Sequence, residues 1–474
     1  MHAIKMHNQA IFLAFLVVYV VVTMVLFHFV YQASQLVVDE EFHLIQGEHY
    51  CRGRFGVWDN KITTFPGLYL VSAGFLGPYR LCSVFALRMT SVVASIANAY
   101  LIFIIRKVVA INRGTAYLML ESISLATLPP LYFFSHLYYT DVISVTMVLM
   151  MVYLNLRAKY HWAALSAGLA IMMRQTNVIW VGFVLGCQLT NVTLYYCLEA
   201  DRRPQRSKQR VRHYTLMDLW TCVKIMIGQP KIIVEVFKHA SLKFPGYELN
   251  LLGFLVFLFT NGSIVVGDRT AHQAAIHLPQ ILYFTLFFAA FSSSHVAIML
   301  HRTLRFMLKR WYVTILCLAA IGAIVHYNTI VHPYMLADNR HYTFYIWNRF
   351  YGRYWWARYA PVPLYYCLLV MVGLMVFSKS TGTQIGQQSH IIGFKIFWIV
   401  ALLASVGLQQ LIEVRYFIVP FLILRLIQNS IKTNVPLLAF ELAVNLIINA
   451  VTFYIFFTKE IFWTEYHDPQ RIIW

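Results

Sequence analysis

The amino-acid sequence predicts an all-α polytopic membrane protein, formed as a single domain over residues 1–474. Three observations support this fold class. Hydrophobic side chains make up 59% of the 474 residues and charged ones only 12%, and the mean hydropathy is +0.62. Apolar runs of about 20 residues, long enough to cross the hydrocarbon layer of a bilayer as helices, recur along the chain. This composition excludes a chain that is soluble and globular throughout.

The apolar runs give the expected elements in order. The first run is too long for the core of a secretory signal and is followed by a poor cleavage site, so it predicts an uncleaved anchor. Residues 66–82 predict a segment lying in the membrane interface, because two prolines and an arginine interrupt it. We expect about 11 to 14 spans. The runs are 9–30, 85–105, 115–134, 141–156, 161–173, 177–198, 249–267, 274–300, 311–330, 361–378, 390–409, 416–430 and 436–457.

Clusters of Lys and Arg predict the orientation, because short loops rich in these residues stay in the cytoplasm. Four clusters agree, at residues 106–113, 157–159, 202–212 and 302–310. They place the N-terminus and the long basic loop 199–245 in the cytoplasm, and the loops 31–65 and 331–360 on the opposite face. Basic cytoplasmic loops and phosphate handling also account for the net charge of +19, so we expect no nucleic-acid partner.

The seven cysteines are scattered along the chain. Cys82 and four others lie in or beside apolar stretches, and none has the paired spacing of a metal site. We therefore expect neither a disulfide framework nor a zinc site.

An acidic segment follows the first apolar run and contains Asp39, Glu40, Glu41 and His43. A carboxylate at a membrane boundary is partly shielded from water, and its tunable pKa suits a general base. Asp39 and Glu40 would point about 100° apart on a helix, so we expect one to act while the other binds. The alternative is a solvated loop face, since runs of acids are common in loops.

The same loop continues with Trp58, Asp59 and Lys61. This mixture is typical of sugar sites, where an aromatic ring covers the apolar face of a pyranose and charged groups bind its hydroxyls. The alternative for Trp58 is an interfacial anchor.

Arginines occur in four further polar clusters beside predicted spans. A guanidinium group binds phosphate oxygens through paired hydrogen bonds and stabilises a departing phosphate as its charge develops. The alternatives are structural salt bridges and helix boundaries at the membrane surface. The residues are Arg174, Gln175, Asn177, Asp268, Arg269, His272, Asp338, Asn339, Arg340, His341, Tyr342, Glu413 and Arg415.

Eight blocks carry a likeness that extends over nearly the whole chain: Asp39–His43, Tyr50–Gly53, Trp58–Tyr69, Arg174–Asn177, Val266–Arg269, Ala337–Tyr345, Arg415–Phe417 and Gln470–Trp474. In this order they resemble the eukaryotic dolichyl-phosphate-glucose α-1,2-glucosyltransferase family. The resemblance implies a multi-pass enzyme of the endoplasmic reticulum membrane with the GT-C glycosyltransferase fold, in which lumenal loops form the active site.

The resemblance also implies the reaction. Glucose would move, with inversion, from dolichyl phosphate β-glucose to the diglucosylated nine-mannose oligosaccharide on diphosphodolichol, forming the terminal α-1,2-glucose of the N-glycan precursor. The partners would be these two lipid-linked substrates and the membrane lipids. We expect no cofactor and no metal, because positioning, a base and phosphate neutralisation suffice.

The resemblance assigns roles to the polar residues. Asp39 is the expected base and Glu40 its substitute, with Glu41 still open. Arg340 and His341, with Arg174 or Arg415, are expected to bind the donor phosphate. Sugar or acceptor contacts are expected from His43, Trp58, Asp59, Lys61, Gln175, Asn177, Asp268, Arg269, His272, Asp338, Asn339 and Tyr342.

Two other functions stay open at this point. Another lumenal GT-C glucosyl- or mannosyltransferase of the same pathway would share the mechanism and differ in its acceptor. A non-enzymatic transporter or channel-associated protein would explain the spans and the polar groups at membrane depth, but not the loop rich in acids and aromatics.

Overall fold

A computed structural model describes residues 2–34, 36–198, 214–269, 274–378, 389–429, 431, 433–464, 466 and 468–474. Within these ranges the chain is helical almost throughout, as the sequence predicts. The only sheet in the described ranges is an antiparallel pair of two-residue strands, β1 (Glu460–Ile461) and β2 (Gln470–Arg471).

Many helices begin where the sequence predicts a start. Proline occupies the first turn of several of them, where its missing N–H costs nothing and its fixed φ suits a helix. The helices are α1 (His2–Ala33), α2 (Glu40–Cys51), α3 (Gly67–Leu76), η1 (Gly77–Tyr79), α4 (Val84–Val109), α5 (Thr115–Ala126), α6 (Pro129–Phe134), α7 (Thr140–Leu156), α8 (Tyr160–Met173), α9 (Asn177–Leu198), α10 (Leu216–Gly228), α11 (Pro230–Lys243), α12 (Pro245–Asn261), α13 (Pro279–Phe291), α14 (Ser293–Lys309), α15 (Trp311–Asn328), α16 (Pro333–Ala337), α17 (Tyr342–Ile346), η2 (Trp347–Tyr351), α18 (Val362–Val376), α19 (Ser389–Val406), η3 (Val414–Phe417), α20 (Ile418–Ile427) and α21 (Val435–Thr458).

Fewer helices are long enough to cross a membrane than the 11 to 14 spans expected. Among the described residues, α1, α4, α9, α15 and α21 are long and apolar enough, and the bent pairs α11–α12 and α13–α14 raise the number from 5 to 7 if each pair is one span. Prolines cause part of the difference, because they divide single apolar runs. The run 115–134 is split into α5 and α6 at Pro129.

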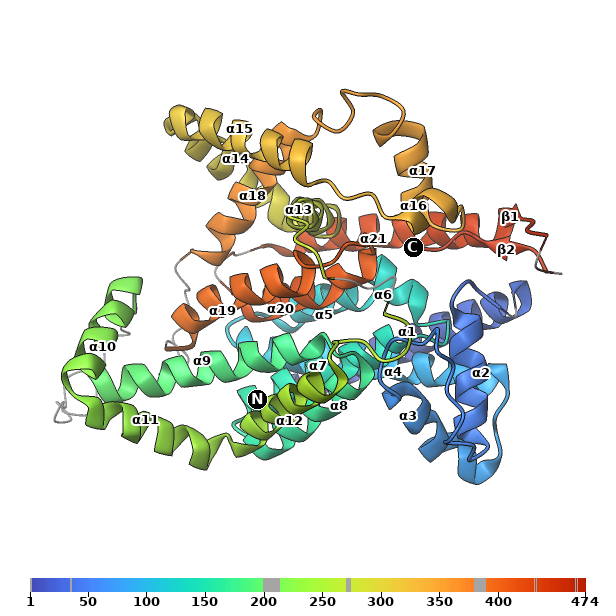
Figure 1. The fold of residues 1–474 in the computed structure, drawn as a ribbon, viewed down its shortest axis with the longest axis horizontal. Coiled ribbons are helices and arrows are strands. Elements are labelled where there is room, and N and C mark those ends of the chain that lie inside the picture. Colours follow the sequence, from blue (N-terminus) through green and yellow to red (C-terminus); the bar gives the residue numbers. More distant parts are fainter. Residues whose placement is uncertain are drawn as a thin grey trace.

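The loops expected on one face lie towards one end of the molecule. In Figure 1, α2 and α3, from the region of residues 31–82, lie towards the right, as do α16, α17 and the β1–β2 pair. Helices α10 and α11 lie at the left. They occupy most of the basic loop expected at 199–245, which is therefore not a plain hydrophilic loop. Its first part, residues 199–213, falls outside the described ranges.

The core lies where α7 packs against α4 and α8, and where α9 packs against α19. Among the described residues, three arginine–glutamate pairs have both side chains almost fully buried: Glu40 with Arg88, Arg106 with Glu121, and Arg425 with Glu441. Charges so far from water are tolerated when they are paired and hydrogen-bonded. These pairs therefore act as fixed links between helices.

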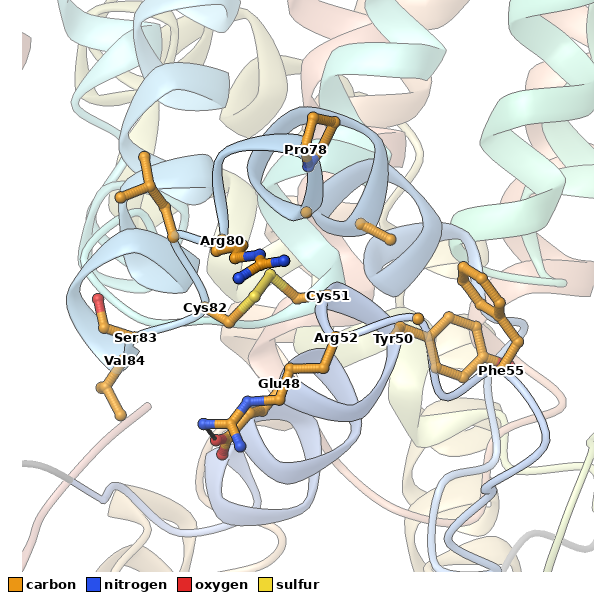
Figure 2. Close-up of a pocket in the computed structure, with 14 residues that line it drawn as sticks. Glu48, Tyr50, Cys51, Arg52, Phe55, Pro78, Arg80, Cys82, Ser83 and Val84 are labelled. Atoms are coloured by element: carbon orange, nitrogen blue, oxygen red, sulfur yellow. Dashed lines mark ion pairs between the residues drawn. A yellow bond between two sulfur atoms is a disulfide. The ribbon is translucent and has the colours of Figure 1, made fainter.

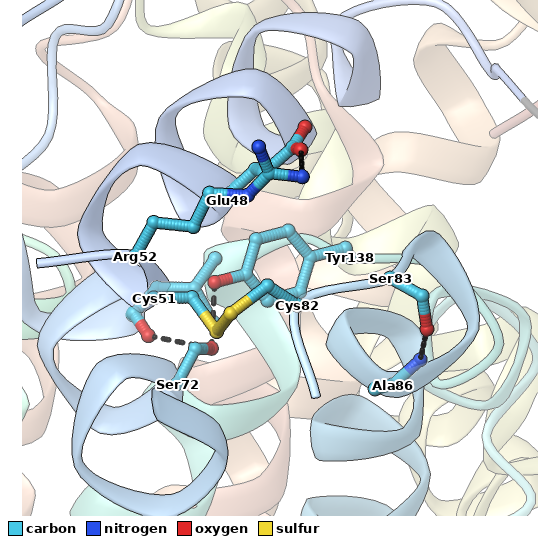
Figure 3. Close-up of a disulfide and its surroundings, with 9 residues drawn as sticks. Glu48, Cys51, Arg52, Ser72, Cys82, Ser83, Ala86 and Tyr138 are labelled. Atoms are coloured by element: carbon cyan, nitrogen blue, oxygen red, sulfur yellow. Dashed lines mark hydrogen bonds and ion pairs between the residues drawn. A yellow bond between two sulfur atoms is a disulfide. The ribbon is translucent and has the colours of Figure 1, made fainter. Parts of the chain in front are cut away.

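A disulfide joins Cys51 to Cys82, which corrects the expectation that the cysteines form none. The two residues are 31 positions apart, and α3 folds back between them, so their proximity is a product of the tertiary fold. Figure 3 shows the bond next to the hydrogen bond between Ser72 and Tyr138, whose oxygens are 2.6 Å apart. The disulfide thus ties the C-terminus of α2 to the segment that precedes α4.

Helix α2 is also fixed by close packing. A Cβ added at Gly47 would lie 2.6 Å from the ring of Tyr138, so only glycine allows the approach of the two segments. Together with the disulfide, this contact holds the helix whose N-terminus enters the site described next.

Candidate active site

A cavity of about 570 Å³ lies between segments that are far apart in the sequence. Its walls come from the loop before α2, α2 itself, residues 61–64, the start of α7 and the residue after α8. The C-terminal half adds Asp268, residues within 334–343, residues 411–416, Trp463 and Trp474. The polar residues in these walls are Asp39, His43, Lys61, Thr63, Thr64, Tyr139, Thr140, Arg174, Asp268, Tyr334, Asp338, Arg340, His341, Thr343, Glu413, Arg415, Tyr416, Trp463 and Trp474. The cavity therefore collects acids, cations and aromatic rings.

Asp39 is the N-cap residue of α2 and faces the cavity. The residue before it, Val38, is buried and has a φ of 51°, a region that β-branched residues rarely adopt. Such strain persists where the surrounding structure enforces it, often at functional sites. Here the unusual backbone at Val38 sets the direction in which the side chain of Asp39 points.

The electrostatic setting of Asp39 favours a base. Loss of hydration among the surrounding protein atoms raises the pKa of its carboxyl, and the charge of Glu413 raises it further, while Arg415, His341 and Arg340 act in the opposite direction; the net shift is upward. Among the described residues, no hydrogen bond or ion pair occupies this carboxylate. It is therefore available to a substrate hydroxyl.

Glu40 has the opposite environment, although it is the next residue. Its side chain is fully buried and receives two hydrogen bonds from Arg88, at 2.8 Å to Oε1 and 2.6 Å to Oε2. The backbone N–H of Tyr138 donates a third, at 2.6 Å. Glu40 is not in the cavity wall, so the structure gives it a structural role in place of the expected one of substitute base. Glu41 is not in the cavity wall either.

His43 lies on the first turns of α2 and its Nδ1 is 2.6 Å from the hydroxyl of Tyr69. Burial lowers the pKa of this imidazole to about 4, and the nearby Arg415 lowers it in the same direction. His43 is therefore neutral at physiological pH, and it can bind a sugar hydroxyl without adding charge.

Two arginines of the cavity wall pair with one buried acid that does not itself line the cavity. Asp141, at the start of α7, pairs with Arg174 and also lies 3.2 Å from Nη1 of Arg415. The other end of the Arg415 guanidinium lies 2.7 Å from Oε2 of Glu413. The sequence analysis named Glu413 as part of a polar cluster but gave it no role, and it did not name Asp141 as a site residue. The pairing of Asp141 with distant arginines appears only in three dimensions.

A third arginine comes from the segment before α17. Asp338 accepts hydrogen bonds from Nε and Nη2 of Arg340, at 2.9 and 2.8 Å. Burial raises the pKa of the Asp338 carboxyl, but hydrogen bonding to Arg340 and the charge of His341 outweigh it and the pKa is lowered. The Arg340 guanidinium also lies 4.2 Å from the ring centre of Trp463. Trp463 and Trp474 are cavity residues that the sequence reasoning missed.

The other expected residues divide into three groups. Lys61 and Asp268 line the cavity, and the Lys61 ammonium lies 4.5 Å from the ring centre of Phe42. His272 lies outside the described residues. The remaining seven do not line the cavity, and several of them form hydrogen bonds that support the fold around it. They are Trp58, Asp59, Gln175, Asn177, Arg269, Asn339 and Tyr342.

Gln175 and Asn177 show what such partners do. The Gln175 amide donates to the carbonyl of Thr63 at 2.9 Å, which supports the cavity wall from behind. Asn177 donates to Ser144 and to the carbonyl of Ala170, both at 2.7 Å, and so links α7, α8 and α9. No group of three or more His, Cys, Asp or Glu side chains suited to a metal ion occurs within the described ranges.

The chain is similar to known proteins over most of its length. The model of the DIE2/ALG10 family matches residues 33–426. A protein of Drosophila melanogaster is 40% identical over 462 residues, covering 96% of this chain and 97% of its own. Relatives from Rattus norvegicus and Homo sapiens are 35% and 33% identical, each covering 92% of this chain and 93% of their own.

All three relatives are named Dol-P-Glc:Glc(2)Man(9)GlcNAc(2)-PP-Dol alpha-1,2-glucosyltransferase. No solved structure matches the chain. The family match covers most of the chain and includes all the cavity segments up to Tyr416. The chain belongs to the DIE2/ALG10 family.

Proposed function

We propose that this protein is an inverting glycosyltransferase of the GT-C type. It moves glucose from dolichyl phosphate β-glucose to a diglucosylated oligosaccharide on diphosphodolichol and forms an α-1,2 link. Membership of the family and the names of the relatives support the substrates. The observation that carries the proposal is a carboxylate with a raised pKa, Asp39, in a cavity that also holds three arginines.

The proposed reaction is one in-line displacement. Asp39 removes the proton from the acceptor 2-hydroxyl, and the oxygen attacks the anomeric carbon of the donor glucose. The bond between that carbon and the phosphate oxygen breaks, and dolichyl phosphate departs with the electron pair from the opposite face of the sugar. A single carboxylate is enough, because phosphate leaves without a general acid.

The cavity cations stabilise the departing phosphate. Arg174, Arg340 and Arg415 each use part of their donor set on an acid and have further N–H groups for phosphate oxygens. Lys61 adds a charge that no acid of the described chain pairs with. With this many cations the reaction needs no metal, and we expect full activity in EDTA.

We also propose that the cavity faces the lumen of the endoplasmic reticulum. The disulfide Cys51–Cys82 is tied to α2, whose other end carries Asp39. Disulfides persist in oxidising compartments and are rare in the cytosol. This supports a lumenal position for the end of the molecule that contains the cavity.

The decisive experiment is glucose transfer by the purified chain, compared between wild type and Asp39→Asn. The wild type should form an α-1,2-linked glucose on the diglucosylated lipid-linked acceptor, and Asp39→Asn should lose at least about 100-fold in kcat, as expected for a missing general base. Glu41→Gln is the matched control, an adjacent acid outside the cavity wall, and should keep its activity. Equal activity of Asp39→Asn and the control would contradict the assignment of the base.

The same assay separates the proposal from its rivals. A related glycosyltransferase of the pathway would prefer an acceptor with fewer sugars, so monoglucosylated and unglucosylated acceptors are tested in parallel. No transfer to any of them by folded wild-type protein would favour a non-enzymatic role.

A further inference from the structure

A second hollow lies at the far end of α2 from the cavity. This open groove of about 1090 Å³ has walls from the C-terminus of α2, the end of α3 with η1, and the start of α4. Figure 2 shows Glu48 and Arg52 on one side, Arg80 and Pro78 on another, and the Cys51–Cys82 bond between them. Neither the reaction cavity nor the mechanism above uses these residues.

The groove carries positive charge. Arg52 pairs with Glu48 at 2.5 Å, and both side chains are about half exposed. Arg80 is exposed, and no acid among the described residues forms an ion pair with it. Its φ of 56° lies in the left-handed region, as the last residue of a tight turn that the adjacent disulfide holds in place. The groove therefore presents one exposed arginine on a constrained backbone, together with a second, partly neutralised one.

The rim of the groove is apolar. Phe55 and Leu81 line it and are 56% and 54% exposed, and Phe75 and Tyr79 beside it are 73% and 75% exposed. The span α4 begins at Val84, in the wall of the groove. Arginines and aromatic rings at the end of a span are typical of the membrane interface. A ligand with a phosphate group and a hydrocarbon chain fits both features.

We propose that this groove binds the diphosphate of the lipid-linked acceptor, with the prenyl chain lying over the apolar rim. The inference rests on the proposed function. In an acceptor of the type named for the relatives, many sugars separate the diphosphate from the glucose that reacts, so the diphosphate cannot share the cavity with Asp39. Helix α2, 12 residues long, spans about 18 Å and separates the two sites.

Kinetics of Arg80→Gln test the proposal. We expect the KM for the lipid-linked acceptor to rise about tenfold, the effect of losing one charge-assisted contact to phosphate, with kcat and the KM for the donor unchanged. The KM for the same oligosaccharide released from its lipid diphosphate should not change. Arg54→Gln is the matched control, because Arg54 is exposed nearby but does not line the groove.

A binding measurement keeps this test independent of transfer activity. Geranylgeranyl diphosphate should raise the thermal unfolding temperature of the wild type and of Arg54→Gln, and should have little effect on Arg80→Gln. Equal stabilisation of all three proteins would overturn the proposal, as would equal competition by phosphatidylserine, which would identify a general phospholipid site. An equal rise in KM for the lipid-linked and released glycans would also overturn it, since the groove would then bind sugars.

Failure of glucose transfer by the wild type would contradict the proposed function and not the groove. In that case loss of diphosphate binding in Arg80→Gln would still show that the groove takes a prenyl diphosphate. The two proposals therefore fail separately.

Discussion

Asp39 and Glu40 show how one peptide bond separates a reactive carboxylate from a structural one. Asp39 lies in the turn before α2 and faces a cavity, whereas Glu40 begins the helix and its side chain turns into the bundle to meet Arg88. A pKa raised by loss of hydration brings Asp39 closer to the working pH of an enzyme. Because Glu40 is paired with Arg88 and does not line the cavity, it is not positioned to take a proton from a substrate.

Replacing Glu413 should therefore move the pH profile. A general base must be deprotonated, so kcat/KM falls as the pH drops through the pKa of Asp39. The charge of Glu413 raises that pKa. Glu413→Gln should lower it and shift the acid limb of the profile to lower pH, measured as kcat/KM across the acid range.

The titration of His43 does not contribute to the acid limb above pH 5, because its pKa of about 4 keeps it neutral there. Glu460→Gln, which removes a half-exposed acid outside the cavity, should leave the limb in place. An acid limb that Glu413→Gln does not move would mean that another group is the base.

Removing the Glu40 charge should affect stability instead. Glu40→Gln leaves Arg88 charged and buried without its partner, at a cost of about 3 to 5 kcal/mol. Thermal unfolding of the purified protein should show a large decrease in midpoint. Glu48→Gln, on the same helix, breaks a half-exposed pair and should cost less than about 1 kcal/mol. Similar midpoints for the two variants would contradict the structural role of Glu40.

Several residues expected at the site lie together in the structure, while their roles stay predictions. Asp39, His43, Arg174, Arg340 and Arg415 all line the cavity. The contrast between Asp39 and Glu40 could not be predicted, because it depends on where Arg88 lies, 48 positions farther along the chain. Asp141 was missed for the same reason, since its arginine partners are distant in sequence.

At the scale of elements, the cavity wall depends on a tight contact between two loops. Gly267 has a φ of 74°, and an added Cβ would lie 2.5 Å from the carbonyl oxygen of Asn60. Its neighbours Val266 and Asp268 donate backbone hydrogen bonds to Thr63 and Asn60, at 3.2 and 2.8 Å. This contact positions residues 61–64 in the cavity wall.

Gly267→Ala should disturb this contact. The clash and the left-handed backbone together should cost about 1 to 3 kcal/mol, lowering the unfolding midpoint, and displacement of the wall should lower kcat/KM. Gly253→Ala is the control, because an added Cβ there meets nothing within 4 Å and α12 accepts alanine. If Gly267→Ala behaves like Gly253→Ala, the loop contact does not shape the site.

Apolar periodicity and proline positions predicted most helices but not how they turn. Residues 66–82 were expected to lie in the interface, and they form α3 and η1 with Phe75 and Tyr79 exposed. Because α3 folds back towards α2, Cys51 meets Cys82. The spacing of the cysteines in the sequence does not predict this turn of the chain. The sequence predicted a loop where α10 and α11 lie, because the basic residues beside them dominate the composition of residues 199–245.

At the scale of the whole molecule, the reaction cavity, the disulfide and the groove lie along one helix, α2, towards one end of the bundle (Figure 1). Helices α10 and α11, which carry Lys224, Lys231, Lys238 and Lys243, lie at the other end. This separation of the cavity from the lysine-bearing helices fits the rule that Lys and Arg clusters stay in the cytoplasm. The sequence and the disulfide thus point to the same orientation by independent routes.

Insertion of a glycosylation sequon tests this orientation directly. A flexible insert at Gly56, an exposed position in the loop after α2, should gain an N-glycan in microsomes, seen as a mass shift that a glycosidase removes. The same insert at Gly228, the last residue of α10, should gain none. Both glycines have open space around them, so neither insertion should prevent folding. A glycan at Gly228 and none at Gly56 would place the cavity in the cytosol, where the disulfide would not persist.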